Sequence, residues 1–215
     1  CDDCSSGTFD VANDDASDSP VSTSGVSIAT SIDSVNDAPA FVGNASMSGT
    51  EENATDPTGE TIVSVLAGSN FSDAEDGSDI SASGENSFAG IAVASNDADG
   101  VNQGVWQYQL DGSSTWVDIS ESLTVDQALL LPDDAQLRFV PISNYNGTPG
   151  DLTVFAVDNS TDGAISTPTM TSTSSETQFD TTTDDATSPV SVSSVNLSTS
   201  VASVNDSPVF VTGGT

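Results

Sequence analysis

The sequence has no histidine and no lysine, and its single cationic side chain, Arg138, stands against 33 Asp and Glu residues. The formal net charge is −32 over 215 residues. Without histidine and lysine there can be no Ser-His-Asp or Cys-His catalytic site, imidazole zinc site, Schiff base or P-loop. One cation cannot replace phosphate counterions, which excludes nucleic acid as a partner, and an anionic membrane would repel the chain.

Apolar residues are also scarce, at 35% hydrophobic and 6% aromatic. No run approaches the ~20 apolar residues of a membrane span, and no signal peptide is visible, so we expect no membrane insertion. Charged residues total only 16% and the aromatics fall in patterned segments, which favours a folded middle over disorder. The start at Cys1 favours a mature or excised fragment. Cys1 and Cys4 form a lone C-x-x-C, which predicts a small local disulfide or free thiols rather than a redox site.

The two ends of the chain repeat each other, and aromatic, proline and Asn-Asp positions stay in register. Matches at an offset of 170 pair Phe9, Asp10, Asp14, Asp15 and Ala16 with Phe179, Asp180, Asp184, Asp185 and Ala186. Matches at an offset of 169 pair Pro20, Val21, Val26, Val35, Asn36, Asp37, Pro39 and Phe41 with Pro189, Val190, Val195, Val204, Asn205, Asp206, Pro208 and Phe210. This self-similarity is the signature of a tandem array.

The Asn-Asp-x-Pro sequences at 36–39 and 205–208 give the unit boundaries. Residues 1–38 are then the end of a preceding unit or a donor segment, 39–207 a complete unit and 208–215 the start of the next.

The complete unit has β-type patterning throughout. Residues 61–66, 90–94 and 152–157 are rich in small and β-branched apolar residues and are bounded by turn residues. Residues 105–119 predict a hairpin that turns at Asp111-Gly112. Leu137, Phe139 and Pro141 alternate in a further strand, and 190–204 predicts one or two long strands. No segment has helical periodicity, so we expect an all-β antiparallel β-sandwich.

Acidic groups stand at the unit junction and next to predicted strands. Calcium requires six to eight oxygen donors, which short acidic loops and Asn carbonyls supply. The simplest interpretation of any one Asp in so acidic a chain is a solvated surface residue. A sandwich, however, brings its loops to one end, where packed carboxylates repel one another unless a cation intervenes. Four such groups are candidates for calcium binding: Asn36-Asp37, Glu51-Glu52-Asn53, Asp73-Ala-Glu75-Asp76-Gly77, and Asp158.

Four motifs carry a resemblance to a known family: EENATDPTGETIVSVLA from Glu51, SDAEDG from Ser72, FAVD from Phe155 and VNDSPVF from Val204. Together they resemble the cadherin-like repeats of giant bacterial surface adhesins, whose pattern is roughly E-N-x-x-x-G-T, D-x-D-x-G, A-x-D and N-D-N-x-P-x-F. The linker here has one residue fewer, Glu75 replaces an Asp, and no D-R-E-type motif is visible.

The resemblance implies an Ig-like or cadherin-like β-sandwich. It also implies that the residues matching the motifs bind Ca²⁺ at the junction and stiffen the array. These are Glu52 of E-N, Asp73 and Glu75 of D-x-D, Asp158 of A-x-D, and Asn36 with Asp37 of the linker.

The remaining candidates have structural and functional interpretations side by side. Arg138 is expected to pair with a carboxylate on a strand face, with anionic-ligand binding as the alternative. Trp106, Tyr108 and Trp116 are expected to pack in the core, with a sugar-stacking platform as the alternative. A glycosidase needs only two carboxylates, but no cleft-forming pattern supports one.

We therefore expect a non-enzymatic, extracellular, cell-surface module of an adhesin stalk or fibre, with calcium at its junctions. Its partners would be adjacent repeats arranged head-to-tail. The alternative is a subunit that donates residues 1–38 to an identical subunit and polymerises into a filament or surface layer. A third hypothesis, an adhesin tip, requires a glycan or protein target at a cell surface.

Overall fold

The computed structural model describes residues 25–31, 37–67, 70–73, 87–159, 178–179 and 188–208. Contacts divide the chain into two units, Cys1–Asp33 and Ser34–Thr215. Of the first unit only 25–31 are described, so the architecture below is that of the second. Cys1, Cys4, Asn36 and Glu75 lie outside the described residues.

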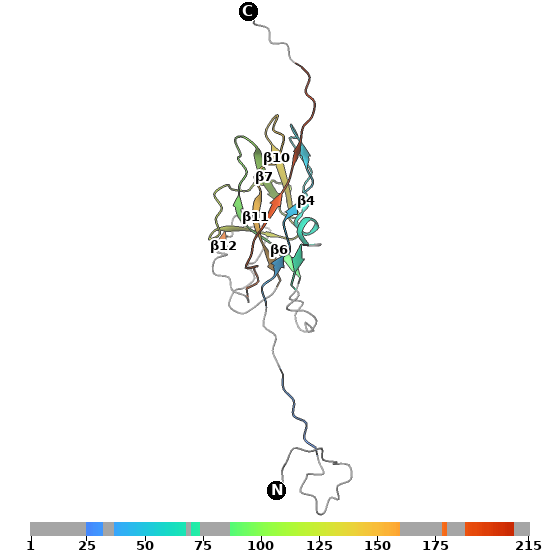
Figure 1. Cartoon of the computed structure of the whole chain (residues 1–215), viewed down its shortest axis with the longest axis vertical. Coiled ribbons are helices and arrows are strands. Elements are labelled where there is room, and N and C mark those ends of the chain that lie inside the picture. The colour runs from blue at the N-terminus through green and yellow to red at the C-terminus, as the bar shows by residue number, and fades with distance from the viewer. Residues whose placement is uncertain are drawn as a thin grey trace, which may run out of the picture. The chain divides into compact units, whose positions relative to one another are not determined.

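In the described part of the second unit, nearly all the regular elements are strands (Figure 1). The strands are β1 (Ala40–Phe41), β2 (Ala45–Ser46), β3 (Thr50–Glu51), β4 (Glu60–Thr61), β5 (Phe71–Ser72), β6 (Phe88–Asn96), β7 (Gly104–Gln109), β8 (Val117–Asp118), β9 (Ala128–Pro132), β10 (Gln136–Pro141), β11 (Leu152–Asp158), β12 (Gln178–Phe179), β13 (Val195–Ser198) and β14 (Val201–Ala202). One π-helical turn, η2 (Val63–Ala67), interrupts them.

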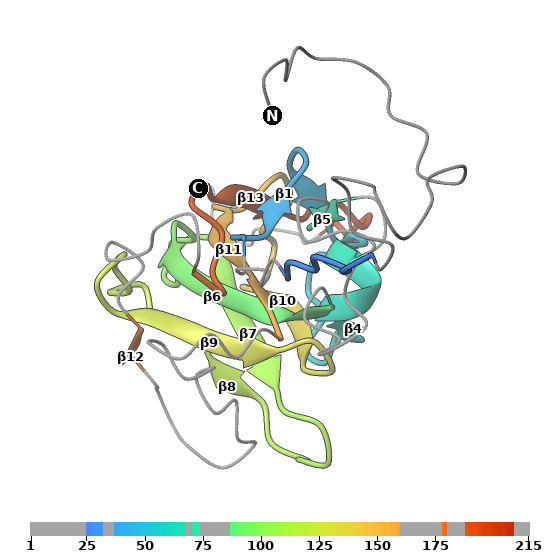
Figure 2. The same cartoon turned by 90° about the horizontal axis from the view of Figure 1, so that it is seen from below.

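The strands form a six-stranded sheet in the order β12-β9-β6-β11-β13-β2 and a four-stranded sheet in the order β4-β10-β7-β8. Two strand pairs, β1-β5 and β14-β3, complete the unit. In the end-on view β6 and β9 run side by side (Figure 2). Pairing is antiparallel except between β13 and β2 and between β14 and β3. The prediction of a mostly antiparallel β fold is confirmed.

One large core cluster draws side chains from both main sheets, including Val93 and Leu152 from the six-stranded sheet and Trp106 and Phe139 from the four-stranded one. The Trp106 ring meets Phe139 edge-on at 5.5 Å, and its indole N–H donates to the Gly150 carbonyl at 2.9 Å. Because Trp106 and Tyr108 are buried, these two residues pack in the core as expected, and the sugar-platform alternative is wrong for them.

A smaller core cluster includes Ala92, Ala94 and Phe155. These residues come from β6 and β11, which also contribute to the large cluster. The two strands are therefore buried on both faces, which explains their nearly continuous apolar sequence. The predicted strands at 90–94 and 152–157 lie within them, and both are confirmed.

The predicted hairpin at 105–119 is also confirmed, since β7 pairs with β8 through Gln107 opposite Asp118. The intervening turn contains Asp111 and Gly112, and Gly112 has a φ of 71°. This left-handed conformation is the one that Asp-Gly turns favour.

The predicted strand at 61–66 is wrong beyond Thr61, where the chain turns into η2. Ile62 and Leu66 are both fully buried. Residues four apart lie on the same face both in a strand and on a helical turn. The spacing of apolar residues therefore could not distinguish a strand from a helical turn. The Ser64 hydroxyl donates to the Thr61 carbonyl at 2.7 Å and supports the turn. The long strands expected at 190–204 are the short β13 and β14.

Gly90 in β6 gives a test of the sheet packing. Its φ is 154°, and a Cβ there would overlap the Leu131 carbonyl oxygen of β9. Gly90→Ala should lower the free energy of unfolding by about 3 kcal/mol, measured by urea denaturation with tryptophan fluorescence. The control is Gly25→Ala, because nothing lies within 4 Å of a Cβ at that position. Equal midpoints for the two variants would contradict this packing.

Candidate functional site

The strand registers place the two linkers of the second unit at opposite ends (Figure 1). β2 and β13 run parallel, with Ala45 beside Leu197, and β11 runs antiparallel to β13, with Leu152 opposite Leu197. The chain therefore enters near Ala40 at what we call the upstream end. It leaves after β14 at what we call the downstream end.

Three of the candidate ligands lie at the upstream end. Asp158 ends β11 opposite Phe88, whose ring contacts Phe71 with centroids 5.2 Å apart. Asp73 directly follows β5, which pairs with β1. Asp37 lies shortly before the start of β1. Asp158 is fully buried, and Asp37 and Asp73 are half-buried. The fold thus brings Asp37, Asp73 and Asp158 to one end of the unit.

Glu52 lies at the other end. Its backbone N–H donates to the Ala202 carbonyl at 2.8 Å, next to the departing chain. At the strand rise of about 3.3 Å per residue, the registers separate Glu52 from Asp158 by on the order of 30 Å. The structure therefore does not bring Glu52 to the other candidates within one unit. Among the described residues no group of three or more acidic or cysteine side chains is placed to hold a metal.

The buried Glu52 carboxylate fastens the departing linker to the body of the unit. Its Oε1 accepts a hydrogen bond from the Val204 backbone N–H at 2.6 Å, and its Oε2 accepts one from the Asn146 side-chain amide at 3.1 Å. Hydrogen bonds to an ionised acceptor are stronger than neutral ones. Glu52 is thus a positioning residue for the start of the linker that follows β14.

The loop that carries Asn146 is also hydrogen-bonded to β14 and to Asn53, which lies just after β3. Gly147 and Val201 exchange backbone hydrogen bonds of 2.9 and 2.8 Å. Asn53 accepts at 2.9 Å from the Asn144 backbone N–H, and both asparagines have left-handed backbones, with φ of 65° and 64°. β14 therefore lies between β3 and this loop, which fixes the direction in which the chain leaves.

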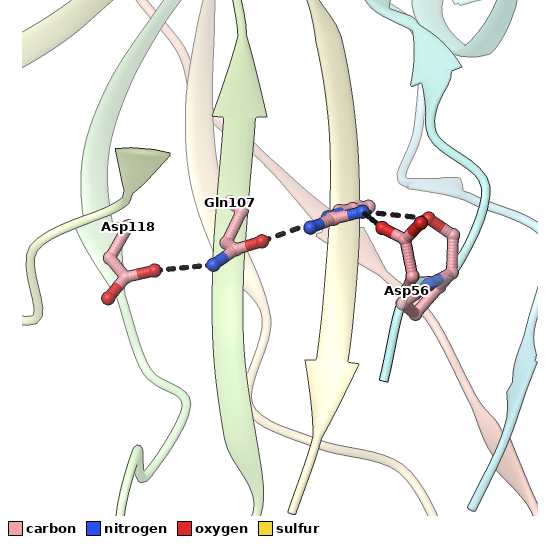
Figure 3. A network of polar contacts seen from close by, with 5 residues as sticks. Asp56, Gln107 and Asp118 are labelled. Atoms are coloured by element: carbon pink, nitrogen blue, oxygen red, sulfur yellow. Dashed lines mark hydrogen bonds and ion pairs between the residues drawn. The ribbon is translucent and has the colours of Figure 1, made fainter. Parts of the chain in front are cut away.

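Arg138 fastens the segment before β4 to the four-stranded sheet. Its Nη1 donates to Asp56 Oδ1 at 2.6 Å and to the Pro57 carbonyl at 3.1 Å, and its Nε donates to Gln107 at 2.9 Å. Gln107 in turn donates to Asp118 at 2.7 Å, and this chain of contacts crosses the sheet in Figure 3. The expected pairing of Arg138 with a carboxylate is confirmed.

Trp116 covers the guanidinium of Arg138, which lies 4.0 Å from the ring centroid. A groove of about 460 Å³ opens beside this contact and is walled partly by Glu51 and Glu60. Because Nε and Nη1 of Arg138 already donate to three acceptors and the walls are acidic, the groove does not favour an anionic ligand. Trp116 serves as a cap on the cation.

A further acidic loop, 97–103, is held by its own hydrogen bonds. The pKa of Asp99 is lowered because the Asn102 side-chain amide and the Val101 and Asn102 backbone N–H groups all donate to its carboxylate. This arrangement explains the acidic residue as a turn-forming one.

Sequence reasoning did not identify Asn146, Asn53 and Asp56 as part of these arrangements. Asn146 precedes a glycine and Asn53 follows Glu52, so either could have been assigned to an ordinary turn. Their partners are about ninety residues away in the sequence, and one sequence cannot show that pairing.

No protein-family model, curated protein or solved structure matches this chain. Within the part of the chain that the structure describes, no helix has the length and hydropathy needed to cross a membrane.

The role of Glu52 can be measured at the Val204 amide. Glu52→Ala removes the acceptor, so that amide should exchange its hydrogen roughly 10- to 100-fold faster. Glu51→Ala is the matched control, because Glu51 is the exposed neighbour of the same type. The Val201 amide, bonded to Gly147, should stay protected in both variants. Unchanged exchange at Val204 in Glu52→Ala would show that another contact holds the linker.

Arg138 gives a second test, in which packing and charge make different predictions. Arg138→Ala strips three acceptors of their donor and uncovers Trp116, so it should cost about 2–4 kcal/mol in urea denaturation. Asp56→Ala should cost less than about 1 kcal/mol, because the Asp56 side chain is 85% exposed. Equal losses would mean that the ion pair itself carries the stability.

Proposed function

We propose that the chain carries a calcium-rigidified unit of an extracellular stalk, a non-enzymatic module with an Ig-like or cadherin-like β-sandwich. The observation that carries the proposal is the position of the linkers. The chain enters and leaves at opposite ends, and candidate ligands lie at both ends. Units linked in this way continue in series, as a stalk at a cell surface requires.

In this proposal each calcium site forms between two units rather than within one. Glu52 comes from the downstream end of one unit, and Asp37, Asp73 and Asp158 come from the upstream end of the next. Asn36 and Glu75 neighbour these residues in the sequence. Val204 aligns with Val35, and from there to Ala40 the chain spans at most about 17 Å. That short linker supports a junction at which the two ends face each other.

Electrostatics supports a divalent cation at such a junction. Like charges brought together in a partly buried site repel by several kcal/mol at short range, and the sequence provides no second cationic side chain to offset them. Extracellular calcium modules bind at about 10⁻⁴–10⁻³ M, which matches extracellular rather than cytosolic calcium.

The polymerising alternative requires an open position for a donated strand. In the second unit β13 already lies between β11 and β2, so donation from another chain would have to displace it. The filled position favours units linked in series within one chain.

The proposal can be tested with a two-unit chain in which residues 39–215 follow residue 207. Its middle linker is a complete junction. We expect 10 mM Ca²⁺ to raise the melting temperature by about 3–10 °C and to protect the junction from proteolysis. Mg²⁺ at equal ionic strength controls for general screening of the −32 charge.

The matched controls differ only in which copy carries the change. Glu52→Gln in the first copy alters the complete junction and should abolish most of the calcium effect. The same change in the second copy lies at an end with no following unit and should leave the effect intact. A calcium effect that is absent, or equal with Mg²⁺, would refute the proposal.

A further inference from the structure

Residues 25–31, the described part of the first unit, leave two apolar side chains bare. Val26 is 87% exposed and Ile28 is 97% exposed. They stand two residues apart, as the side chains on one face of a strand do. Isolated apolar side chains at a surface are common, so exposure alone does not identify a partner.

The internal repeat identifies what this segment is. At the offset of 169, Val26 aligns with Val195 and Ile28 aligns with Leu197. In β13 both partners belong to the main core cluster, and Leu197 is fully buried. Ser27, between them, aligns with the exposed Asn196. Val195 and Leu197 are therefore buried, whereas the equivalent Val26 and Ile28 are exposed to solvent.

The surroundings of β13 show what would cover such a strand. β13 pairs antiparallel with β11, placing Leu197 opposite Leu152, and parallel with β2, placing Leu197 beside Ala45. A copy of the unit without its own β13 would leave both neighbouring strands with unmade backbone hydrogen bonds and an open core. The matching side chains make 25–31 complementary to that gap.

We propose that residues 25–31 form the β13 strand of a preceding copy of this unit. Val26 and Ile28 enter the core of that copy, and Ser27 faces solvent. Ile28 lies between the positions equivalent to Leu152 and Ala45. The proposal rests on the serial arrangement of units but does not require calcium.

The preceding copy is favoured over a second separate chain for a structural reason. A complete chain already fills its own position with Val195–Ser198. A strand inserted from outside would first have to displace one that is paired on both sides. The suitable acceptor is a unit for which 25–31 is the only β13 available.

The test places residues 39–170 ahead of the complete chain, so that 39–170 and 1–38 together make one more unit at the natural offset. All measurements are made in EDTA, which separates this proposal from the calcium effect. In the extended chain the Val26 and Ile28 amides should exchange at least 100-fold more slowly than in the original chain. A second cooperative unfolding transition should appear.

Two variants distinguish insertion from a nonspecific contact. Ile28→Asp should abolish the added transition and the new protection, whereas Ser27→Asp should leave both in place. In the original chain neither variant should change the melting temperature. Equal amide exchange in the two chains, or equal effects of the two variants, would overturn the proposal. So would dimerisation of the original chain that Ile28→Asp abolishes, because the strand would then exchange between chains.

Discussion

Much of this structure depends on one constraint, which is that 33 carboxylate side chains share a single cationic side chain. Backbone and side-chain amides act as their donors: Val204 and Asn146 for Glu52, Ser48 for Glu60 and Gly100 for Glu121. The one cation is placed where it joins the segment before β4 to the sheet. Amide donors satisfy the carboxylate oxygens without a counter-charge, which allows a chain with so few cationic side chains to order its loops.

The strands that could be predicted from the sequence are those whose residue patterns fit a strand better than a helical turn. β6 and β11 have nearly continuous apolar sequences, and the hairpin at 105–119 combines alternation with an Asp-Gly turn. The turn at η2 could not be predicted in this way, because Ile62 and Leu66 fit both a strand and a helical turn. The short strands β1, β2 and β3 are defined by their pairing with β5, β13 and β14, and no local sequence pattern predicts them.

The candidate site was predictable in composition but not in arrangement. Asp37, Asp73 and Asp158 were expected together, and each follows or precedes a strand that reaches the upstream end. Glu52 was expected with them, but β3 runs parallel to β14 and carries it to the downstream end. Which end a loop reaches depends on the number and direction of strands before it, and a motif does not encode that number.

The two parallel strand pairs determine how the unit would respond to a pulling force. β2 and β3 follow the upstream linker, and their partners β13 and β14 precede the downstream linker. A pull on the two linkers draws these parallel neighbours in opposite directions along their length. The hydrogen bonds between them are then loaded together in shear instead of opening one after another, so the strands that join the unit to its linkers also resist extension.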